Sequence, residues 1–191
     1  MSLTNPLSKC ILVLTALAVL LSGQIIAAPA KAQASASDRA FSPFGMCSHP
    51  MWGYGHATID RELDALSAAG GKWLRFDAEW RDGEPQRGVY YDWYFRQIDY
   101  ICSAAKARGI EVQVNVFGTP GWANGGKGLA VPPTNDADFA NFIRKMVATY
   151  RGRIKYWEIW NEQNISEFWQ PSPDAARYTR LLKAAYEAAK A

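Results

Sequence analysis

The sequence predicts an α/β fold whose strands run parallel in a single sheet. Short apolar runs rich in β-branched residues alternate with segments of helical periodicity, in the order βαβαβαβα. Short turns follow the helices and longer loops follow the strands, as crossover helices between parallel strands require. Polar residues gather at the carboxyl ends of the expected strands. These observations favour a barrel or a doubly wound sheet.

Four strands and four helices are expected along residues 44–191. The strands are expected at residues 44–47, 73–80, 110–117 and 154–161. The helices are expected at residues 58–69, 92–108, 136–150 and 174–191. Thr58 is the expected cap of the first helix, and Gly70 and Gly109 end the first two. Residues 81–88 and 118–134 are expected to be loops.

Composition excludes several classes of function. The chain has 191 residues, a net charge of +3 and 49% hydrophobic residues, which suits one globular domain. It has no basic run, so nucleic acid is not an expected partner. The stretch after the first strand, FGMCSHPMWGYG, lacks both the GxGxxG and the Walker patterns, which argues against a nucleotide site. No Cys/His cluster has metal-ligand spacing, and we expect neither a metal nor another cofactor.

Residues 1–34 read as a secretory signal peptide. Lys9 precedes an apolar run over residues 10–21, and Ala32-Gln33-Ala34 is a plausible cleavage site. The run is shorter than the roughly 20 residues that a membrane span needs, although an uncleaved anchor remains the alternative. Residues 35–43 then form a polar lead-in. We expect a secreted or periplasmic protein with no membrane contact after cleavage.

Export permits disulfide bonds, and two cysteines remain after the predicted cleavage site. Cys102 lies in a helical pattern beside small residues, where a buried free thiol is the commoner outcome. We therefore favour free thiols over a bridge between Cys47 and Cys102.

Rings, carboxylates and carboxamides dominate the carboxyl ends of the strands, where parallel α/β folds place their active sites. In chain order they are His49, Trp52, Tyr54 and His56; Asp77, Glu79 and Trp80; Asn115, Thr119, Pro120 and Trp122; and Asn161, Glu162 and Asn164. The chain has 8 Trp, 9 Tyr and 8 Phe, enough to line a cleft with flat faces. This set suits a neutral polyhydroxylated ligand, because rings stack on sugar faces and carboxamides bridge hydroxyl groups.

Individual tryptophans have two readings, core packing or sugar platform. Three of them precede or lie within expected core segments and are assigned to the core: Trp73, Trp93 and Trp157. Three follow strand ends and are balanced between core and sugar platform: Trp80, Trp122 and Trp169. His56 and Asp77 are further ligand contacts to test, and Glu79 is either an outer-subsite residue or solvated.

Two motifs and one arginine carry a resemblance to a known group of enzymes. WEIWNEQN, with Asn161-Glu162 closing the fourth strand, resembles the Asn-Glu motif of the clan of retaining glycoside hydrolases built on (β/α)8 barrels. TPGWA after the third strand is similar to the β-xylosidase-like and cellulase-like branches, and Arg75 on the second strand also matches. The resemblance implies that residues 44–191 are four βα units of a TIM barrel, the N-terminal half of a catalytic domain.

The resemblance also implies a reaction and a set of roles. It implies a retaining O-glycosyl hydrolase of β-glycosidase type that acts on a poly- or oligosaccharide, with Glu162 as general acid/base. Substrate-binding residues would be Asn161, which holds the sugar 2-hydroxyl, and Arg75, Trp122, Trp80, His56 and Asn164. A glycosidic oxygen leaves only when protonated, so the acid needs a pKa above that of a free Glu, which a low-dielectric wall of rings would supply.

Glu158 is the second acid of the motif. Period-two counting places Glu158, Trp160 and Glu162 on one face of the strand. A barrel-interior carboxylate is costly unless paired, so we expect Glu158 to bind Arg75 and to take no part in proton transfer. Strand ends often bulge, and the counting leaves open how both Asn161 and Glu162 reach the cleft.

The retaining mechanism needs a second carboxylate, and in this clan it comes from the seventh strand. No Glu of this sequence maps onto that position, and a complete barrel takes about 250 residues. We expect the chain to be the N-terminal part of a longer glycosidase, inactive alone. The alternatives are a half-barrel that pairs with a second half-barrel, or a secreted non-catalytic module that binds carbohydrate or another protein.

Overall fold

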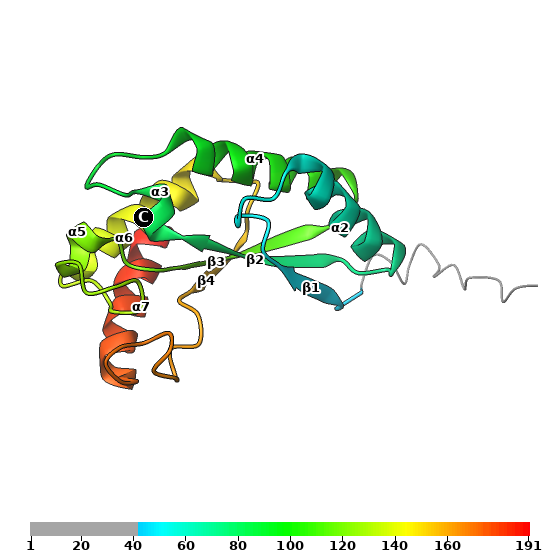
Figure 1. Ribbon diagram of the computed structural model, residues 1–191. Coiled ribbons are helices and arrows are strands. Elements are labelled where there is room, and N and C mark those ends of the chain that lie inside the picture. Colours follow the sequence, from blue (N-terminus) through cyan, green and yellow to red (C-terminus); the bar gives the residue numbers. More distant parts are fainter. Residues whose placement is uncertain (1–41) are drawn as a thin grey trace, which may run out of the picture. The chain divides into compact units, whose positions relative to one another are not determined.

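A computed structural model describes residues 42–191, which form one parallel four-stranded sheet flanked by helices (Figure 1). The strands pair in the order β1-β2-β3-β4. Their bounds are Gly45–Ser48 for β1, Trp73–Glu79 for β2, Glu111–Phe117 for β3 and Tyr156–Ile159 for β4. Every neighbouring pair is parallel, so the predicted alternation of strand and helix is confirmed. The arrangement is that of a partial TIM barrel.

Four longer helices connect or follow the strands. They are α2 (His56–Ala68), α4 (Asp92–Ala107), α6 (Asp136–Thr149) and α7 (Ala175–Lys190). Two single-turn helices follow the second and third strands. The helix α3 (Trp80–Gly83) begins at the residue that was expected to end the second strand, and α5 (Gly121–Asn124) lies in an expected loop. The expected cap Thr58 is wrong: Gly55 caps α2 with its backbone, and Thr58 lies inside the first turn.

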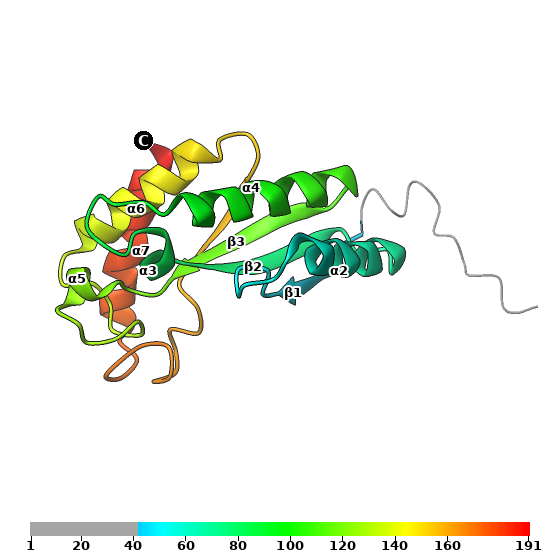
Figure 2. The ribbon, with the colours of Figure 1, turned by 45° about the horizontal axis from the view of Figure 1, so that its top comes forward.

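The core lies between the sheet and the helix layer, because each helix has one apolar stripe and each strand has one apolar face. Figures 1 and 2 show α2 and α4 lying along the same side of the sheet. The buried strand residues are Leu74, Phe76, Ala78, Val112, Val114 and Val116, each at most 4% exposed. The buried helix residues that belong to this core include Ile59, Leu63, Ile98, Ile101, Phe142, Ile143, Met146 and Leu181.

Trp93 departs from the expected core assignment, since its side chain is 44% exposed. In α4 the buried positions follow the spacing of Tyr94, Ile98, Ile101 and Ala105, which are fully buried. Trp93 precedes the first of these by one residue, about 100° around the helix axis. It therefore points away from the sheet.

The opposite face of the sheet, called the inner face below, carries the alternate strand residues. Arg75 of β2 is in register with Gln113 of β3, and Asp77 is in register with Asn115. Glu158 of β4 is in register with Asn115. Polar and charged side chains thus line up across three strands on the side away from α2 and α4. In a closed barrel this face surrounds the axis.

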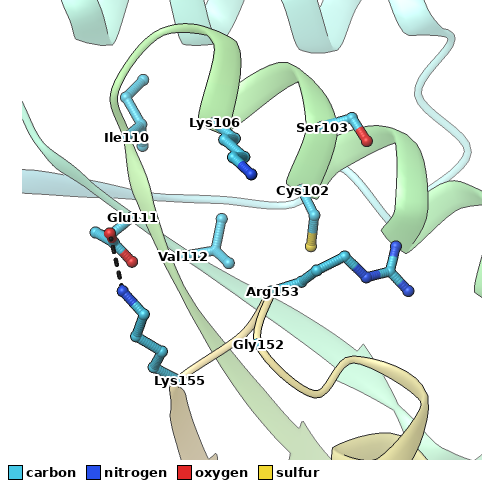
Figure 3. A pocket seen from close by; sticks show the side chains of 9 residues that line it. All are labelled: Cys102, Ser103, Lys106, Ile110, Glu111, Val112, Gly152, Arg153 and Lys155. Atoms are coloured by element: carbon cyan, nitrogen blue, oxygen red, sulfur yellow. Dashed lines mark hydrogen bonds and ion pairs between the residues drawn. The ribbon is translucent and has the colours of Figure 1, made fainter.

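The two cysteines of the described chain are both free, as favoured from the sequence. Cys102 lines a cleft of about 350 Å³ with Lys106, Arg153 and Lys155, near the start of β3 (Figure 3). Burial raises the pKa of the Cys102 thiol to about 12, so it stays protonated. Two of the cleft's cations are paired, Arg153 with Asp99 and Lys155 with Glu111. The cleft lies at the amino-terminal edge of the sheet, away from the strand ends that carry function in barrels.

Within residues 42–191, none of the helices is both long and apolar enough to cross a bilayer. The predicted signal peptide lies outside the described residues.

Candidate active site

A cleft of about 740 Å³ opens at the carboxyl ends of the strands. Strand residues and strand-end loops supply its polar lining: Cys47, His49, Arg75, Asp77, Glu79, Asn161, Glu162, Glu167 and Gln170. Its apolar lining comes from Trp52, Phe117, Leu129, Ala130 and Phe168, with Gly128 completing the wall. Parallel α/β folds place their active sites at this edge. The sequence-predicted residues Arg75, Asn161 and Glu162 all reach this cleft.

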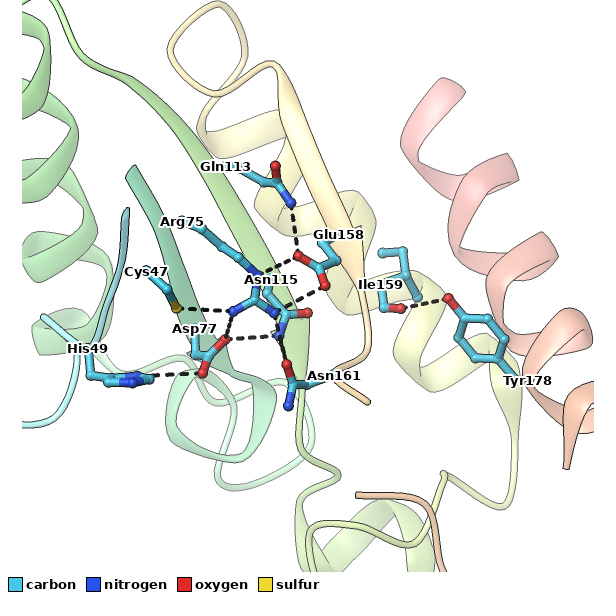
Figure 4. A network of polar contacts seen from close by, with 10 residues as sticks. All are labelled: Cys47, His49, Arg75, Asp77, Gln113, Asn115, Glu158, Ile159, Asn161 and Tyr178. Carbon is cyan, nitrogen blue, oxygen red and sulfur yellow. Dashed lines mark hydrogen bonds and ion pairs between the residues drawn. The ribbon is translucent and has the colours of Figure 1, made fainter. Parts of the chain in front are cut away.

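Arg75 is the hub of the site and binds side chains from three strands or strand ends (Figure 4). Its Nε donates to Glu158 Oε2 at 2.7 Å, and its Nη2 donates to Glu158 Oε1 at 3.1 Å. Nη2 also donates to Asn161 Oδ1 at 2.8 Å, and Nη1 donates to Asp77 Oδ1 at 3.2 Å. The expected pairing of Arg75 with Glu158 is therefore confirmed, in the two-pronged geometry that guanidinium and carboxylate prefer.

Glu158 is held as an ionised carboxylate. Partial burial acts to raise its pKa, but hydrogen bonds from Arg75 and Gln113 and the Arg75 charge leave that pKa below its ordinary value of 4.5. Gln113 Nε2 donates to Glu158 Oε2 at 2.9 Å. The hydrogen bond to Glu158 in turn raises the pKa of Arg75. A carboxylate with a lowered pKa and two fixed partners is a poor proton donor, which supports a structural role for Glu158.

Asn161 has a defined amide orientation because Arg75 has only donors to offer. The guanidinium must face the amide oxygen, and Oδ1 is the atom that accepts from Nη2. Asn115 Nδ2 also approaches Oδ1, at 3.5 Å, and donates to Asp77 Oδ1 at 2.9 Å. The amide nitrogen of Asn161 is thereby left to donate to a ligand in the cleft.

Glu162 lines the cleft and is exposed. Three rings, those of Trp52, Phe117 and Phe168, line the same cleft, but residues 42–191 leave Glu162 exposed and not enclosed as expected. Glu79 is the cleft acid with a raised pKa, because burial outweighs the charge of Arg81, whose Nε lies 2.6 Å from Glu79 Oε2.

The end of β4 has unusual backbone geometry. The strand ends at Ile159, two residues before the predicted end, and Trp160 adopts a φ of 70°. Glu162 is left-handed as well, with a φ of 44°. The Trp160 ring is buried, and its Nε1 donates to the Phe168 carbonyl at 2.7 Å. Period-two counting therefore fails at Trp160, which the sequence placed on the inner face with Glu158.

The loop after β1 presents the one tryptophan with an open face in the cleft. Trp52 is 61% exposed, and its ring stacks on His49 with centroids 3.9 Å apart. His49 Nδ1 lies 3.7 Å from Asp77 Oδ2. Buried Gln97 of α4 holds the loop from behind, donating to the carbonyls of Pro50 and Tyr54 at 3.0 Å each. Trp52 thus has a supported ring and a free face.

Trp80 and Trp122 are not cleft residues, contrary to the sequence prediction. Trp80 is fully buried, and its Nε1 donates to Glu84 Oε2 at 2.8 Å. Trp122 donates to the Glu84 carbonyl at 2.9 Å, and Arg87 covers its ring at 4.4 Å. Trp80 continues the buried parity of Leu74, Phe76 and Ala78, so the alternation already contained the signal.

Three other predicted or considered residues also lie elsewhere. His56 begins α2 and stacks on Tyr100 of α4, with centroids 3.5 Å apart, outside the cleft. Asn164 is exposed and absent from the cleft lining. Trp169 is 1% exposed and packs against Trp160. Each of the three follows the end of a strand by several residues. A residue that is close to a strand end in sequence therefore need not lie close to the cleft.

The sequence prediction missed the supporting role of Gln113 and undervalued Trp52 and His49. A signal for Gln113 existed, because Gln113 and Asn115 are polar residues at one parity of an otherwise β-branched strand. No such signal marked Trp52, whose stacking on His49 depends on how the loop folds.

Comparison with known proteins places this geometry in a family. The family model described as cellulase, glycosyl hydrolase family 5, matches residues 34–191. A family 39 glycoside hydrolase from the gut symbiont Bacteroides cellulosilyticus is 27% identical, with a TM-score of 0.58 over 77% of this chain and 29% of its own. No curated protein matches the chain.

Two further solved structures share the fold at lower identity. A family 5 enzyme from Bifidobacterium longum subsp. longum, in complex with Manβ1-4GlcNAc, is 19% identical with a TM-score of 0.61 over 76% of this chain and 40% of its own. An endoglucanase from Pseudomonas stutzeri, in complex with cellobiose, is 13% identical with a TM-score of 0.55 over 69% and 38%. The chain thus spans well under half the length of the solved chains that it matches.

Proposed function

The chain belongs to glycosyl hydrolase family 5, and from that premise we propose that it carries the acid/base half of a retaining β-glycosidase site. Glu162 is the general acid/base, and Asn161 donates to the 2-hydroxyl of the sugar. The observation that carries this assignment is the division of labour between two neighbouring acids. Glu158 is locked by Arg75 and Gln113, whereas Glu162 faces the cleft beside an amide that Arg75 orients.

The proton transfers follow from that arrangement. Glu162 protonates the glycosidic oxygen as the bond to the anomeric carbon breaks, and then removes a proton from the attacking water in the second step. Asn161 contributes a hydrogen bond that strengthens as positive charge develops on the ring. Arg75 fixes Asn161 and neutralises Glu158, so it acts on the sugar through its neighbours.

We further propose that the nucleophile comes from strand–helix units other than these four. A retaining site needs two carboxylates about 5–5.5 Å apart. Two features support a partner segment: the inner face of the sheet is partly exposed, and so is Glu162. A C-terminal half of the same enzyme, or a second half-barrel, would supply both.

The substrate class is a β-linked oligo- or polysaccharide, with Trp52 as a sugar platform. Support comes from the free face of Trp52 in the same cleft as Asn161 and Glu162. An exposed indole in a polar cleft suits the apolar face of a pyranose ring. Because structural neighbours were solved with cellobiose and with Manβ1-4GlcNAc, β1-4-linked disaccharides are the first probes.

Export remains part of the proposal, with residues 1–34 as the leader. Mass spectrometry of the mature protein from the culture medium or periplasm checks it. A mature chain that begins at Ser35 supports export, and one that retains Met1 contradicts cleavage.

The decisive experiment compares the chain alone with a completed barrel. Residues 42–191 alone should not hydrolyse aryl β-glycosides. Fusion to the C-terminal units of a family 5 enzyme should restore turnover, and Glu162→Gln should remove it for poor leaving groups while sparing part of the first step for dinitrophenyl glycosides, which need little protonation. Robust hydrolysis by the unfused chain would contradict the need for a second half.

A non-catalytic carbohydrate-binding role is the second candidate, favoured by the exposed Trp52 and the exposed Glu162. It predicts sugar binding that Glu162→Gln leaves intact and a fusion that never turns over.

A further inference from the structure

Consecutive strand residues point to opposite faces, yet Asn161 and Glu162 both line the cleft. Glu158 lies on the inner face with Arg75, so Trp160 would return to that face and Asn161 would point toward the helices. The structure shows the reverse assignment. Asn161 reaches Arg75 on the inner face, and Trp160 is 1% exposed within the core. The alternation of side chains between the two faces of the sheet is therefore shifted by one residue at Trp160.

The shift coincides with the left-handed backbone of Trp160, where φ is 70°. Bulky residues avoid this region, because Cβ crowds the backbone, and occupying it costs roughly 1–3 kcal/mol. Its amide still donates to Val116 O at 2.9 Å, so the residue remains attached to β3 while its side chain leaves the strand alternation. Contacts of the Trp160 indole ring must therefore offset the free energy of this left-handed backbone conformation.

The ring contacts are extensive. Trp160 Nε1 donates to Phe168 O at 2.7 Å, which ties the strand end to the loop that follows Glu162. Its ring packs edge-on against Trp169 at 5.1 Å, Phe139 at 6.1 Å and Phe117 at 6.5 Å. A buried indole with a satisfied N–H and three ring neighbours outweighs a local strain of this size.

We propose that Trp160 is the positioning residue of the site: its anchored ring holds a left-handed turn that directs Asn161 to Arg75 and Glu162 into the cleft. The ring itself does not contact substrate. Its role in catalysis rests on the proposed function of Glu162, but its effect on Asn161 can be measured without any sugar.

A double-mutant cycle on stability tests the proposal. Asn161→Ala removes the Arg75–Asn161 hydrogen bond, and its cost is measured by guanidinium unfolding in three backgrounds: wild type, Trp160→Phe and Trp80→Phe. Trp80 is the matched control, because it is equally buried and also loses one indole hydrogen bond. The shift in unfolding midpoint should be the same in wild type and Trp80→Phe, and at least halved in Trp160→Phe.

Equal midpoint shifts in all three backgrounds would overturn the positioning role and leave Trp160 as core packing only. Glu158→Gln provides an internal control, because its bond to Arg75 precedes the turn and its shift should be unchanged by Trp160→Phe. Should Trp160→Phe fail to fold, Trp160→Tyr is the second variant, because its side chain is larger than that of Phe and it loses the same indole hydrogen bond. The same reduced shift with Asn161→Ala is expected there.

Affinity for cellobiose separates this inference from the proposed function. If wild type binds, Trp160→Phe should weaken binding several-fold relative to Trp80→Phe. Absence of binding by every variant would count against the proposed substrate, while the unfolding cycle would still decide the role of Trp160.

Discussion

The two faces of the four-stranded sheet are made from the same strands and carry opposite kinds of side chain. The face toward α2 and α4 is an apolar layer in which Leu74, Phe76 and Val114 are almost fully buried. The inner face carries Arg75, Asp77, Gln113, Asn115 and Glu158, joined by hydrogen bonds and ion pairs. The first face stabilises the fold by burying apolar side chains. On the second face, hydrogen bonds and ion pairs fix the orientation of the polar side chains.

The difference shows where the chain tolerates change. Burial is nondirectional and scales with area, so the helix side depends on volume. Ion pairs with partly exposed partners contribute less free energy, but they fix the orientation of each atom. Two neighbouring residues of one strand point to opposite faces. Substituting the apolar one should therefore change the stability of the fold more, and substituting the polar one should mainly change the geometry of the inner face.

The largest expected effect is on the apolar face. Phe76→Ala should lower the free energy of unfolding by about 3–5 kcal/mol, because a fully buried ring leaves a cavity. Gln113→Ala, on the inner face of the neighbouring strand, should cost at most about 1 kcal/mol. Guanidinium unfolding of both variants measures the contrast. Similar costs would mean that the two faces are not energetically distinct.

Breaking the hub should have an intermediate effect. Arg75→Met leaves Glu158 and Asp77 without their cation, at a cost of roughly 2 kcal/mol, because the Arg75 and Glu158 side chains are only 26% and 34% exposed. The double variant Arg75→Met/Glu158→Met should recover part of that loss, since no unpaired charge remains at Glu158. A double variant less stable than Arg75→Met, by thermal unfolding, would show that Glu158 has another stabilising partner of equal weight.

A smaller effect is expected at the rim of the inner face. Trp52→Ala should weaken cellobiose binding by about threefold to tenfold, the equivalent of one aromatic stacking contact. Trp93→Ala is the matched control, because Trp93 is similarly exposed but lies outside the cleft. Titration calorimetry provides the measurement. Equal affinities of the two variants would remove Trp52 from the site.

The smallest effect concerns pH. Because the pKa of Glu158 is lowered in the folded chain, the ion pair stabilises the fold above the unfolded value of about 4.5 and loses that contribution as pH falls through the folded pKa. The difference in melting temperature between wild type and Glu158→Gln should therefore be largest above pH 5 and shrink in more acidic buffer. A difference that stays constant down to pH 3 would contradict the ionised assignment.

Sequence reasoning recovered the fold because both of its signals are local. Period-two alternation and helical spacing depend on neighbours along the chain, and they placed the four strands and the four longer helices but not the single-turn helices α3 and α5. The pairing of Arg75 with Glu158 also followed from the alternation, since a charge on the inner face needs a partner there.

The misplaced residues have physical reasons. Trp80 was assigned by its nearness to a strand end, although its parity matched Phe76 and Ala78. His56 and Asn164 lie several residues beyond their strands, where loop paths decide position and no periodic rule applies. The turn at Trp160 depends on contacts with Phe139, in the preceding helix, and with Phe168, in the loop after the strand. Neither contact can be read from the alternation within the strand.

Gln97 of α4 supports the rim of the cleft without being part of its lining. Its amide donates to the carbonyls of Pro50 and Tyr54 on either side of Trp52, from a helix on the far side of the loop. The loop that carries Trp52 is therefore held to α4 on both sides of that residue. Substitutions at Gln97 would therefore move the loop that carries Trp52 without changing Arg75, Asn161 or Glu162. The loop at the rim of the cleft and the polar network of the inner face are thus supported by different elements, α4 for the first and strands β2 to β4 for the second.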